Sequence, residues 1–172
     1  MLSITMQKAL NEQVNAEYYS AYLYLSMAAW FESLNLNGFA NWMRVQTQEE
    51  LAHGTIIFNF VSQRGGRVTL TAIGAPQTEW ESPRKVFEDA YAHEQKVTAL
   101  INKLVDLAIK ESDHATNAFL QWFVTEQVEE EMNTSGIANQ LKVSGDSPQA
   151  LFMIDRELAA RVFTMPSPLV VV

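Results

Sequence analysis

Four stretches of the chain, each about 30 residues long, carry apolar side chains at alternating steps of four and three residues. This spacing places those side chains on one face of an α-helix, because a helix turns once every 3.6 residues. The stretches are residues 3–34, 38–64, 82–111 and 113–143. In a chain of 172 residues, the pattern predicts an all-α fold with one core built from four long amphipathic helices.

Capping signals mark where these helices begin and end. Gly65 and Gly66 suit the left-handed turn that follows a helix. Ser82 offers a side-chain cap and is followed by Pro83, which fits the first position of a helix. Asp113 offers a cap for the last long helix.

The lengths of the connections indicate the topology. Short links join the first helix to the second and the third to the fourth, whereas residues 67–81 form one long link without helical periodicity. Residues 144–148 then form a break before a short fifth helix at about residues 149–161. This order is typical of a four-helix bundle with a single long crossover. We expect a bundle at residues 1–145, a fifth helix within 146–162 and a tail at 163–172.

Polar residues interrupt the apolar stripe of every long helix near its midpoint. Glu17, for example, stands in the stripe that runs from Leu10 to Phe31. The second helix carries three polar positions, of which Gln46 is the first. In an antiparallel bundle, six of the interrupting side chains are expected to meet at mid-height: Glu17, Glu50, His53, Glu94, Gln127 and Glu130.

Four buried glutamates cost several kcal/mol each unless protons or cations neutralise them. Two divalent cations match four negative charges, and shared carboxylates can bridge two metals. His53, one turn after Glu50, completes a first-metal set with Glu17 and Glu50. Oxygen ligands with one imidazole and no thiolate suit iron or manganese, with zinc as a competitor. Tyr24 lies in the inward stripe seven residues after Glu17, where it is placed to form a hydrogen bond with the metal site or to supply an electron.

Composition excludes several other kinds of protein. The chain has no cysteine, so disulfides, thiolate-bound zinc, iron–sulfur clusters and thiol nucleophiles are excluded. Its net charge of −8 disfavours nucleic acid and anionic membranes as partners and favours cations. The longest apolar run, residues 21–31, is too short to span a bilayer, and we expect a cytoplasmic protein.

Other metal-ligating side chains have simpler interpretations. We expect His93 and His114 to lie on an exposed face or at a helix start. The methionines expected to fill the core are Met27, Met43, Met132 and Met153. The apolar residues of the fifth helix need a partner surface, which favours assembly into a multi-subunit shell; they are Leu151, Ile154 and Leu158.

Three segments carry a resemblance to the non-haem ferritins of bacteria and archaea. They are residues 15–27 (NAEYYSAYLYLSM), 48–53 (QEELAH) and 122–131 (WFVTEQVEEE). The resemblance covers nearly the whole chain. It implies a ferritin-like diiron bundle in which Glu17, Glu50 and His53 bind the first iron. Glu50, Glu94 and Glu130 would bind the second iron, with Gln127 close to it.

The same resemblance implies a third iron position. Its ligands would be Glu49, Glu126 and Glu129, joined by Glu130. Glu126 and Glu129 are each turned about 100° from the inward stripe, so they lie on a neighbouring face of the helix. Trp122 matches an aromatic residue beside the diiron centre.

Three differences separate the chain from related diiron proteins. Bacterioferritins repeat Glu-x-x-His in the fourth helix, where this chain has Gln127 and Glu130. They also place a haem-ligating methionine where this chain has Leu51, so we expect no haem. Rubrerythrins need a cysteine-ligated iron domain, which a chain without cysteine cannot form.

The resemblance implies an iron-storage protein and ferroxidase that oxidises Fe(II) with dioxygen or hydrogen peroxide. Fe(III) would then be stored as a mineral inside a shell of 24 chains, with the fifth helix at an intersubunit channel. Two alternatives remain open from the residues alone. One is a structural bundle with an inert or zinc-filled site, and the other is a diiron oxygenase that acts on an organic substrate.

Overall fold

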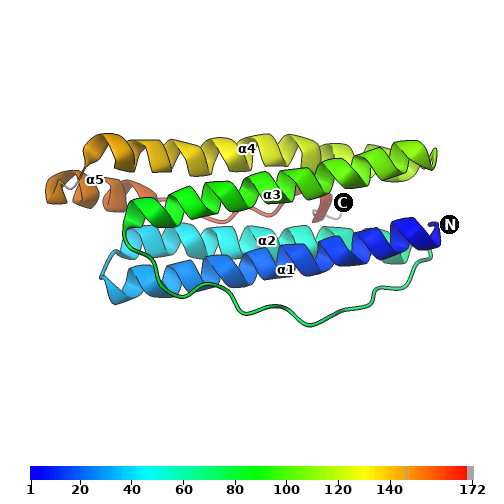
Figure 1. The fold of residues 1–172 in the computed structure, drawn as a ribbon, viewed down its shortest axis with the longest axis horizontal. Coiled ribbons are helices and arrows are strands. Elements are labelled where there is room, and N and C mark those ends of the chain that lie inside the picture. The colour runs from blue at the N-terminus through cyan, green and yellow to red at the C-terminus, as the bar shows by residue number, and fades with distance from the viewer. Residues whose placement is uncertain (146, 170–172) are drawn as a thin grey trace.

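The computed structural model describes residues 1–145 and 147–169, and within them all regular secondary structure is helical. The elements are α1 (Ile4–Ser33), α2 (Asn37–Gln63), α3 (Pro83–Lys110), α4 (His114–Ser144), α5 (Pro148–Leu158) and a 3₁₀ turn, η1 (Ser167–Leu169). The four long helices lie side by side as a bundle, with α1 packed along α2 and α3 along α4 (Figure 1). The predicted all-α bundle is confirmed, although α5 ends three residues before the expected Arg161. No helix in this part of the chain combines the length and the apolar character that crossing a membrane requires.

Side-chain caps begin four of the five α-helices. The hydroxyls of Ser3, Ser82 and Ser147 and the carboxylate of Asp113 each accept a backbone N–H three residues further on. Such a cap stabilises a helix by about 1 kcal/mol. Gly65 has a φ of +72°, so the expected left-handed turn after α2 is present.

The long connection between α2 and α3 runs along the outside of α1 from one end of the bundle to the other (Figure 1). Polar side chains on α1 hold its backbone. Asn11 donates to the Arg67 carbonyl at 3.0 Å, and its own side-chain oxygen accepts from the Thr69 N–H. Further along, Ser26 donates to the Gln77 carbonyl at 2.6 Å. The crossover is therefore fixed by hydrogen bonds and not by packing alone.

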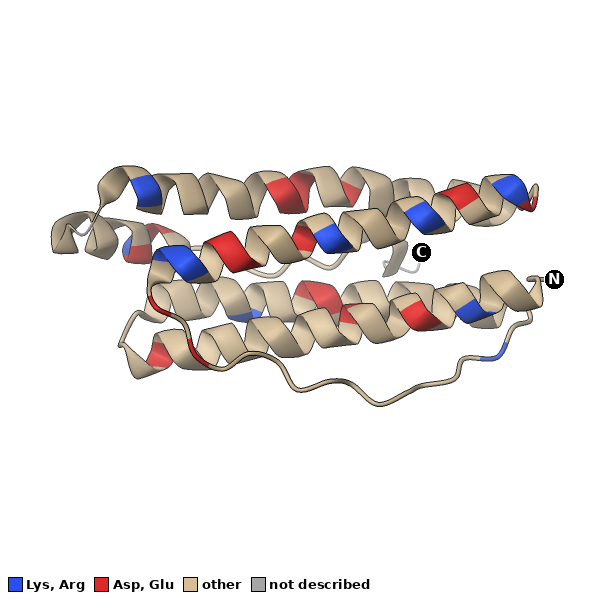
Figure 2. Ribbon diagram, viewed as in Figure 1, with Lys and Arg blue, Asp and Glu red and all other residues tan. Residues whose placement is uncertain are grey.

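The core of the bundle divides into two apolar clusters. One lies around Phe31, Phe39 and Phe87, and the other around Leu10 and Leu120. Most of the polar side chains that are buried lie between these clusters, and acidic positions occur near the middle of all four long helices (Figure 2).

Two of the methionines predicted to fill the core do not do so. Met27 and Met43 are buried, but Met132 and Met153 are 64% and 71% exposed. The prediction failed for these two because they lie on the outer faces of α4 and α5. An exposed methionine on a helix that is otherwise well packed leaves apolar surface available for another chain.

Helix α5 docks onto the start of α2 in the same chain. One carboxylate oxygen of Asp155 accepts the backbone N–H groups of Gly38 at 2.8 Å and Phe39 at 3.0 Å. Because the cap position of α2 supplies no side-chain bond, Asp155 serves as its cap from a distant part of the sequence. Ile154 and Leu158 are buried and Leu151 is half-buried against the same cluster, so the apolar face expected to need another subunit is largely covered within the chain.

Candidate metal centre

The six polar side chains expected at mid-height are all buried. Glu17 comes from α1, Glu50 and His53 from α2, Glu94 from α3, and Gln127 and Glu130 from α4. None of them is more than 4% exposed. Each occupies a position in the apolar stripe of its helix, so the periodicity that builds the core also directs these side chains into it.

Glu17, Glu50 and His53 form a compact group. Their nearest ligand atoms all lie within 4.8 Å of one another, close enough to hold one metal ion. Nδ1 of His53 is 3.7 Å from a carboxylate oxygen of Glu50. Gln13 lies one turn before Glu17, and its side-chain amide donates to Oε1 of Glu17 at 2.8 Å. This hydrogen bond fixes the direction of the Glu17 carboxyl group.

Two atoms of this group have no hydrogen-bond partner among the described residues: Oε2 of Glu17 and Nε2 of His53. A buried polar atom without a partner costs about 1–3 kcal/mol. Both atoms are metal-ligating types, and a cation between them would satisfy both. The donor set of this chain therefore fits a divalent ion.

Glu94 and Glu130 are held by other side chains in the layer. Tyr24 donates its hydroxyl hydrogen to Glu94, and the Gln127 amide donates to the other oxygen of Glu94 at 3.1 Å. The amide of Gln46 donates to both Glu50 at 3.1 Å and Glu130 at 2.7 Å. Glu50, Glu94 and Glu130 do not converge as closely as the first group. Their assignment as ligands of a second iron stays a prediction.

Burial and mutual repulsion control the charges of this layer. Burial, reinforced by the charge of Glu50, raises the pKa of Glu17 to about 8 and that of Glu94 to about 8. Burial and the charge of Glu94 raise the pKa of Glu130 well above its ordinary value. Glu17 and Glu94 therefore hold protons at neutral pH, and a metal ion that binds there must displace them.

Glu50 behaves differently from its neighbours. Burial alone would raise its pKa, but interactions with His53 and the Gln46 amide lower it below the ordinary value. Its charge in turn contributes to the raised pKa of Glu17, Glu94 and Glu130. Glu50 is therefore the anionic centre of the layer, next to both halves of the expected diiron site.

The residues expected at a third iron position are only partly brought together. Oε1 of Glu126 lies 3.8 Å from Nε2 of His53, and Glu126, His53 and Glu130 form a second group within 4.8 Å. Glu49 is instead paired with Arg161, and Glu129 is exposed. Their assignment to a third iron remains a prediction.

Aromatic rings surround the imidazole of His53. The ring of Trp122 lies 5.5 Å away, edge to face, and that of Phe123 lies 6.0 Å away. Trp122 thus lies beside the site, at the place that the resemblance indicated. These rings limit the rotation of His53 and keep its nitrogens directed toward Glu50 and Glu126.

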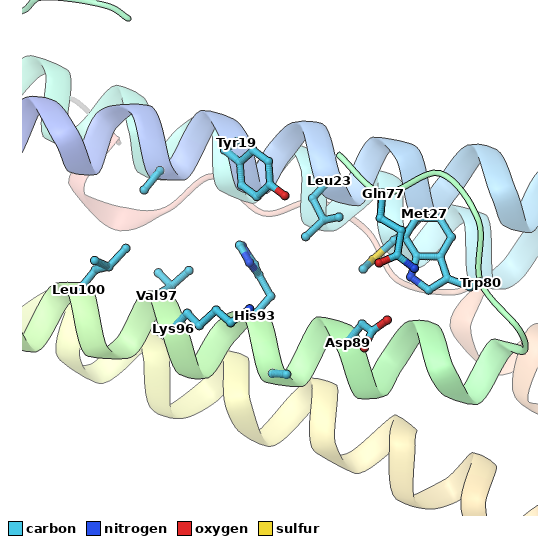
Figure 3. A pocket seen from close by; sticks show the side chains of 12 residues that line it. Tyr19, Leu23, Met27, Gln77, Trp80, Asp89, His93, Lys96, Val97 and Leu100 are labelled. Carbon is cyan, nitrogen blue, oxygen red and sulfur yellow. The ribbon is translucent and has the colours of Figure 1, made fainter. Parts of the chain in front are cut away.

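His93 is not on an exposed face, contrary to the prediction, whereas His114 is exposed at the start of α4. One ring nitrogen of His93 lies 2.8 Å from the Ser20 hydroxyl, and its ring lies edge-on to Tyr24. His93 borders a cleft of about 380 Å³ between α1 and α3, which Trp80 and Gln77 of the crossover also line (Figure 3). None of the six polar side chains of the central layer lines this cleft.

Sequence reasoning missed two residues that act on the layer. Gln46 could have been recognised from the sequence, because it is a polar residue in an apolar stripe one turn before Glu50. Arg161 gave no signal, because it was expected as the last residue of the fifth helix, whereas α5 ends at Leu158 and Arg161 lies in the segment that follows. It donates to Gln46 at 2.9 Å and to Glu49 at 2.5 Å.

The fold and the site together define a metal-binding four-helix bundle rich in carboxylates. Comparison with known proteins identifies the family. The model of the ferritin-like domain matches residues 7–143, and the chain therefore belongs to the ferritin family.

Individual relatives agree with this assignment. The bacterial non-heme ferritin of Bacteroides fragilis is 43% identical over 161 residues, which cover 94% of this chain and 100% of that protein. The corresponding protein of Staphylococcus saprophyticus is 44% identical over 163 residues, covering 95% and 98%.

Solved structures of the ferritin from Archaeoglobus fulgidus have the same fold. An engineered closed form matches with a TM-score of 0.94 and 54% identity, over 95% of this chain and 100% of that one. The open-pore form matches with a TM-score of 0.94 and 53% identity, over 94% and 100%.

Proposed function

We propose that this chain is an iron-storage protein that oxidises Fe(II) at a two-iron site and retains Fe(III) inside a multi-subunit shell. The observation that carries the proposal is the pair of unsatisfied buried atoms, Oε2 of Glu17 and Nε2 of His53, in one compact group with Glu50. Membership of the ferritin family and the non-heme ferritins among its relatives support the same function.

In the proposed site, Glu17, Glu50 and His53 bind one iron, and Glu50, Glu94 and Glu130 bind the other. Glu50 is assigned to both irons because it belongs to the compact group with Glu17 and His53 and shares the Gln46 amide with Glu130. Gln127 and Tyr24 orient Glu94 through the two hydrogen bonds to its oxygens.

The reaction follows from the charges of these ligands. Each Fe(II) gives up one electron, and dioxygen takes two electrons and two protons to form hydrogen peroxide. If hydrogen peroxide is the oxidant, it takes two electrons and two protons to form two waters. Anionic oxygen ligands stabilise Fe(III) over Fe(II) and so favour the oxidation. Protons displaced from Glu17 and Glu94 on metal binding are available near the site.

Storage requires an enclosed volume, and we propose that 24 copies form it. Large apolar side chains remain exposed on α4 and α5 of the single chain: Val128, Met132, Val143, Phe152 and Met153. An apolar surface of this kind is normally covered in an assembly. The structures of the A. fulgidus ferritin are described as an open-pore ferritin and as an engineered closed form, which supports a porous shell for this chain as well.

We further propose a third iron position at Glu126 and Glu130, with Glu49 and Glu129 as additional ligands. It would receive iron that leaves the diiron pair. Haem is not part of the proposal, because Leu51 offers no ligand where bacterioferritins carry methionine.

Anaerobic addition of two Fe(II) per chain, followed by mixing with air in a stopped-flow instrument, tests the proposal. We expect rapid oxidation, an amber product, and a mass by light scattering many times the 19.4 kDa of one chain. A structural bundle would bind the metal without oxidising it. An oxygenase would oxidise iron and consume an organic co-substrate without forming mineral. Either result, or a monomeric mass, would contradict the proposal.

A further inference from the structure

Arg161 reaches the metal centre from the segment that follows α5. Its guanidinium lies 4.2 Å from the centre of the Trp42 ring, and one of its nitrogens donates to the Trp42 carbonyl at 3.3 Å. The backbone carbonyl of Arg161 accepts a bond from the Asn41 amide at 2.9 Å. Only 19% of the Arg161 side chain is exposed, so its position is well defined.

The first consequence concerns the orientation of Gln46. Nη1 of Arg161 donates to the amide oxygen of Gln46 at 2.9 Å, so that oxygen must face the guanidinium. The amide nitrogen then faces the layer and donates to Glu50 and Glu130. If the Gln46 amide were rotated by 180°, its oxygen would face the carboxylates of Glu50 and Glu130, and its nitrogen would face the guanidinium of Arg161. Acceptor would then meet acceptor and donor would meet donor, which is unfavourable.

The second consequence concerns Glu49. Nη2 of Arg161 lies 2.5 Å from a carboxylate oxygen of Glu49, and both side chains are less than one-fifth exposed. Glu49 therefore already has a cation as its partner. Glu126 and Glu129, which we assign to the same third position, have no ion pair with a lysine or arginine in the described part of the chain.

We propose that Arg161 is a positioning residue that sets the iron stoichiometry of the chain. It orients Gln46 toward the diiron carboxylates and holds Glu49 in an ion pair, so a third iron gains Glu49 as a ligand only by displacing the guanidinium. This inference rests on the proposed function, because it assumes two tight iron ions and a weaker third. The segment after α5 thereby controls how readily iron leaves the pair for the third position.

Anaerobic Fe(II) calorimetry of the full-length protein, with Arg161→Ala, tests the inference without relying on turnover. We expect the third Fe(II) to bind roughly five- to tenfold more tightly, since a partly buried carboxylate loses its competing cation. The first two ions should bind no more tightly than in the wild type, because Gln46 loses the hydrogen bond from Arg161 that orients its amide. A merely structural role would weaken all three together, and that result would overturn the inference.

Three further variants complete the test. Arg161→Lys keeps the competing charge but loses the forked donor and the stacking on Trp42, so its third-ion affinity should lie between those of the wild type and Arg161→Ala. When Arg161→Ala is combined with Glu49→Gln, the gain in affinity for the third Fe(II) should disappear. Arg156→Ala removes the same charge from an exposed position on α5 and should change nothing. If Arg161→Lys matches Arg161→Ala, or the gain survives without Glu49, competition for Glu49 is disproved.

The wild type itself separates the two proposals. Two tight ions in the wild type, with an unchanged third ion in Arg161→Ala, reject the role of Arg161 and leave the oxidation function standing. A wild type without two tight ions rejects the function and this inference with it. Thermal unfolding of each variant shows whether it is folded.

Discussion

Nε2 of His53 lies 3.8 Å from Oε1 of Glu126, although Glu126 is one residue away from the inward stripe of α4. The two acidic faces of α4 are therefore less separate than helical geometry alone indicates. Glu126 reaches the imidazole that also belongs to the group with Glu17 and Glu50. Replacing the residues around the diiron pair should therefore affect iron oxidation to three different extents.

Replacing glutamates of α4 one at a time should reveal these differences. Glu130→Ala removes a buried ligand and should slow the first oxidation phase by at least about 100-fold, as expected when a metal ligand is lost. Glu126→Ala should slow it only a few-fold, through His53. Glu129→Ala should leave the first phase unchanged and alter only later turnover, because Glu129 is exposed. Stopped-flow oxidation at stepwise iron loading measures each phase, and equal effects of Glu126→Ala and Glu130→Ala would contradict this order.

Glu50→Ala should abolish rapid Fe(II) oxidation, because Glu50 is the carboxylate next to both halves of the site. Removing the charge that raises the pKa of three neighbours should also bring those pKa values down. The metal-free chain should then be at least as stable as the wild type. Glu88→Ala, which removes an exposed glutamate of the Arg84 pair, is the matched control. Wild-type oxidation rates in Glu50→Ala would rule out the diiron site.

The stability of the metal-free protein should fall as pH rises from about 5 to 8. Glu17 and Glu94 have an ordinary pKa of 4.5 and a folded-state pKa of about 8. A raised folded-state pKa means that the folded chain binds protons that the unfolded chain has released. The contribution is fully present below 4.5 and is lost as pH rises through 8, by up to about 1.4 kcal/mol per pH unit for each group.

Denaturant unfolding in the presence of a chelator, at pH 5.5, 7 and 8.5, measures this dependence. Glu94→Gln keeps the shape of the neutral carboxyl and should flatten the curve. With Zn²⁺ bound the trend should reverse, since protons compete with the metal for the same oxygens. A free energy of unfolding that is constant between pH 5.5 and 8.5 would show that these carboxyls are not protonated in the folded chain.

The sequence allowed the bundle and its polar layer to be predicted because both follow from one periodicity. A stripe at steps of four and three identifies the inward positions, so Glu17 and Glu94 could be placed in the core without coordinates. The same stripe does not say how wide the buried face is. Met132 was therefore expected inside but is exposed, and His93, one residue before Glu94, is half-buried because Ser20 and Tyr24 of α1 contact it.

Contacts between distant segments could not be predicted in this way. Arg161 and Asp155 act on α2 from a part of the chain whose direction depends on the break after α4. A single arginine or aspartate outside a stripe carries no information about which distant group it meets. Gln46 could have been included, because its stripe position was visible, but the orientation of its amide depends on Arg161.

The docking of α5 onto α2 should depend on the absence of a side chain at Gly38. A Cβ atom there would lie 1.6 Å from the backbone carbonyl oxygen of Asp155, a contact that the backbone cannot relieve without moving α5. Gly38→Ala should destabilise the chain by about 1–3 kcal/mol, the usual cost of overpacking. Asp155→Ala, which removes the cap of α2 without a clash, should cost about 1 kcal/mol.

Gly136→Ala is the matched control for Gly38→Ala. Gly136 also lies inside a long helix, but a Cβ added there would meet no atom within 4 Å from the other described residues, apart from its chain neighbours and the nearby backbone of α4. The better helix propensity of alanine should then stabilise α4 by up to about 1 kcal/mol. Denaturant unfolding of the three variants compares these values. Opposite signs for the two glycine replacements are expected, whereas a Gly38→Ala variant as stable as the wild type would show that α5 does not need its close approach to α2.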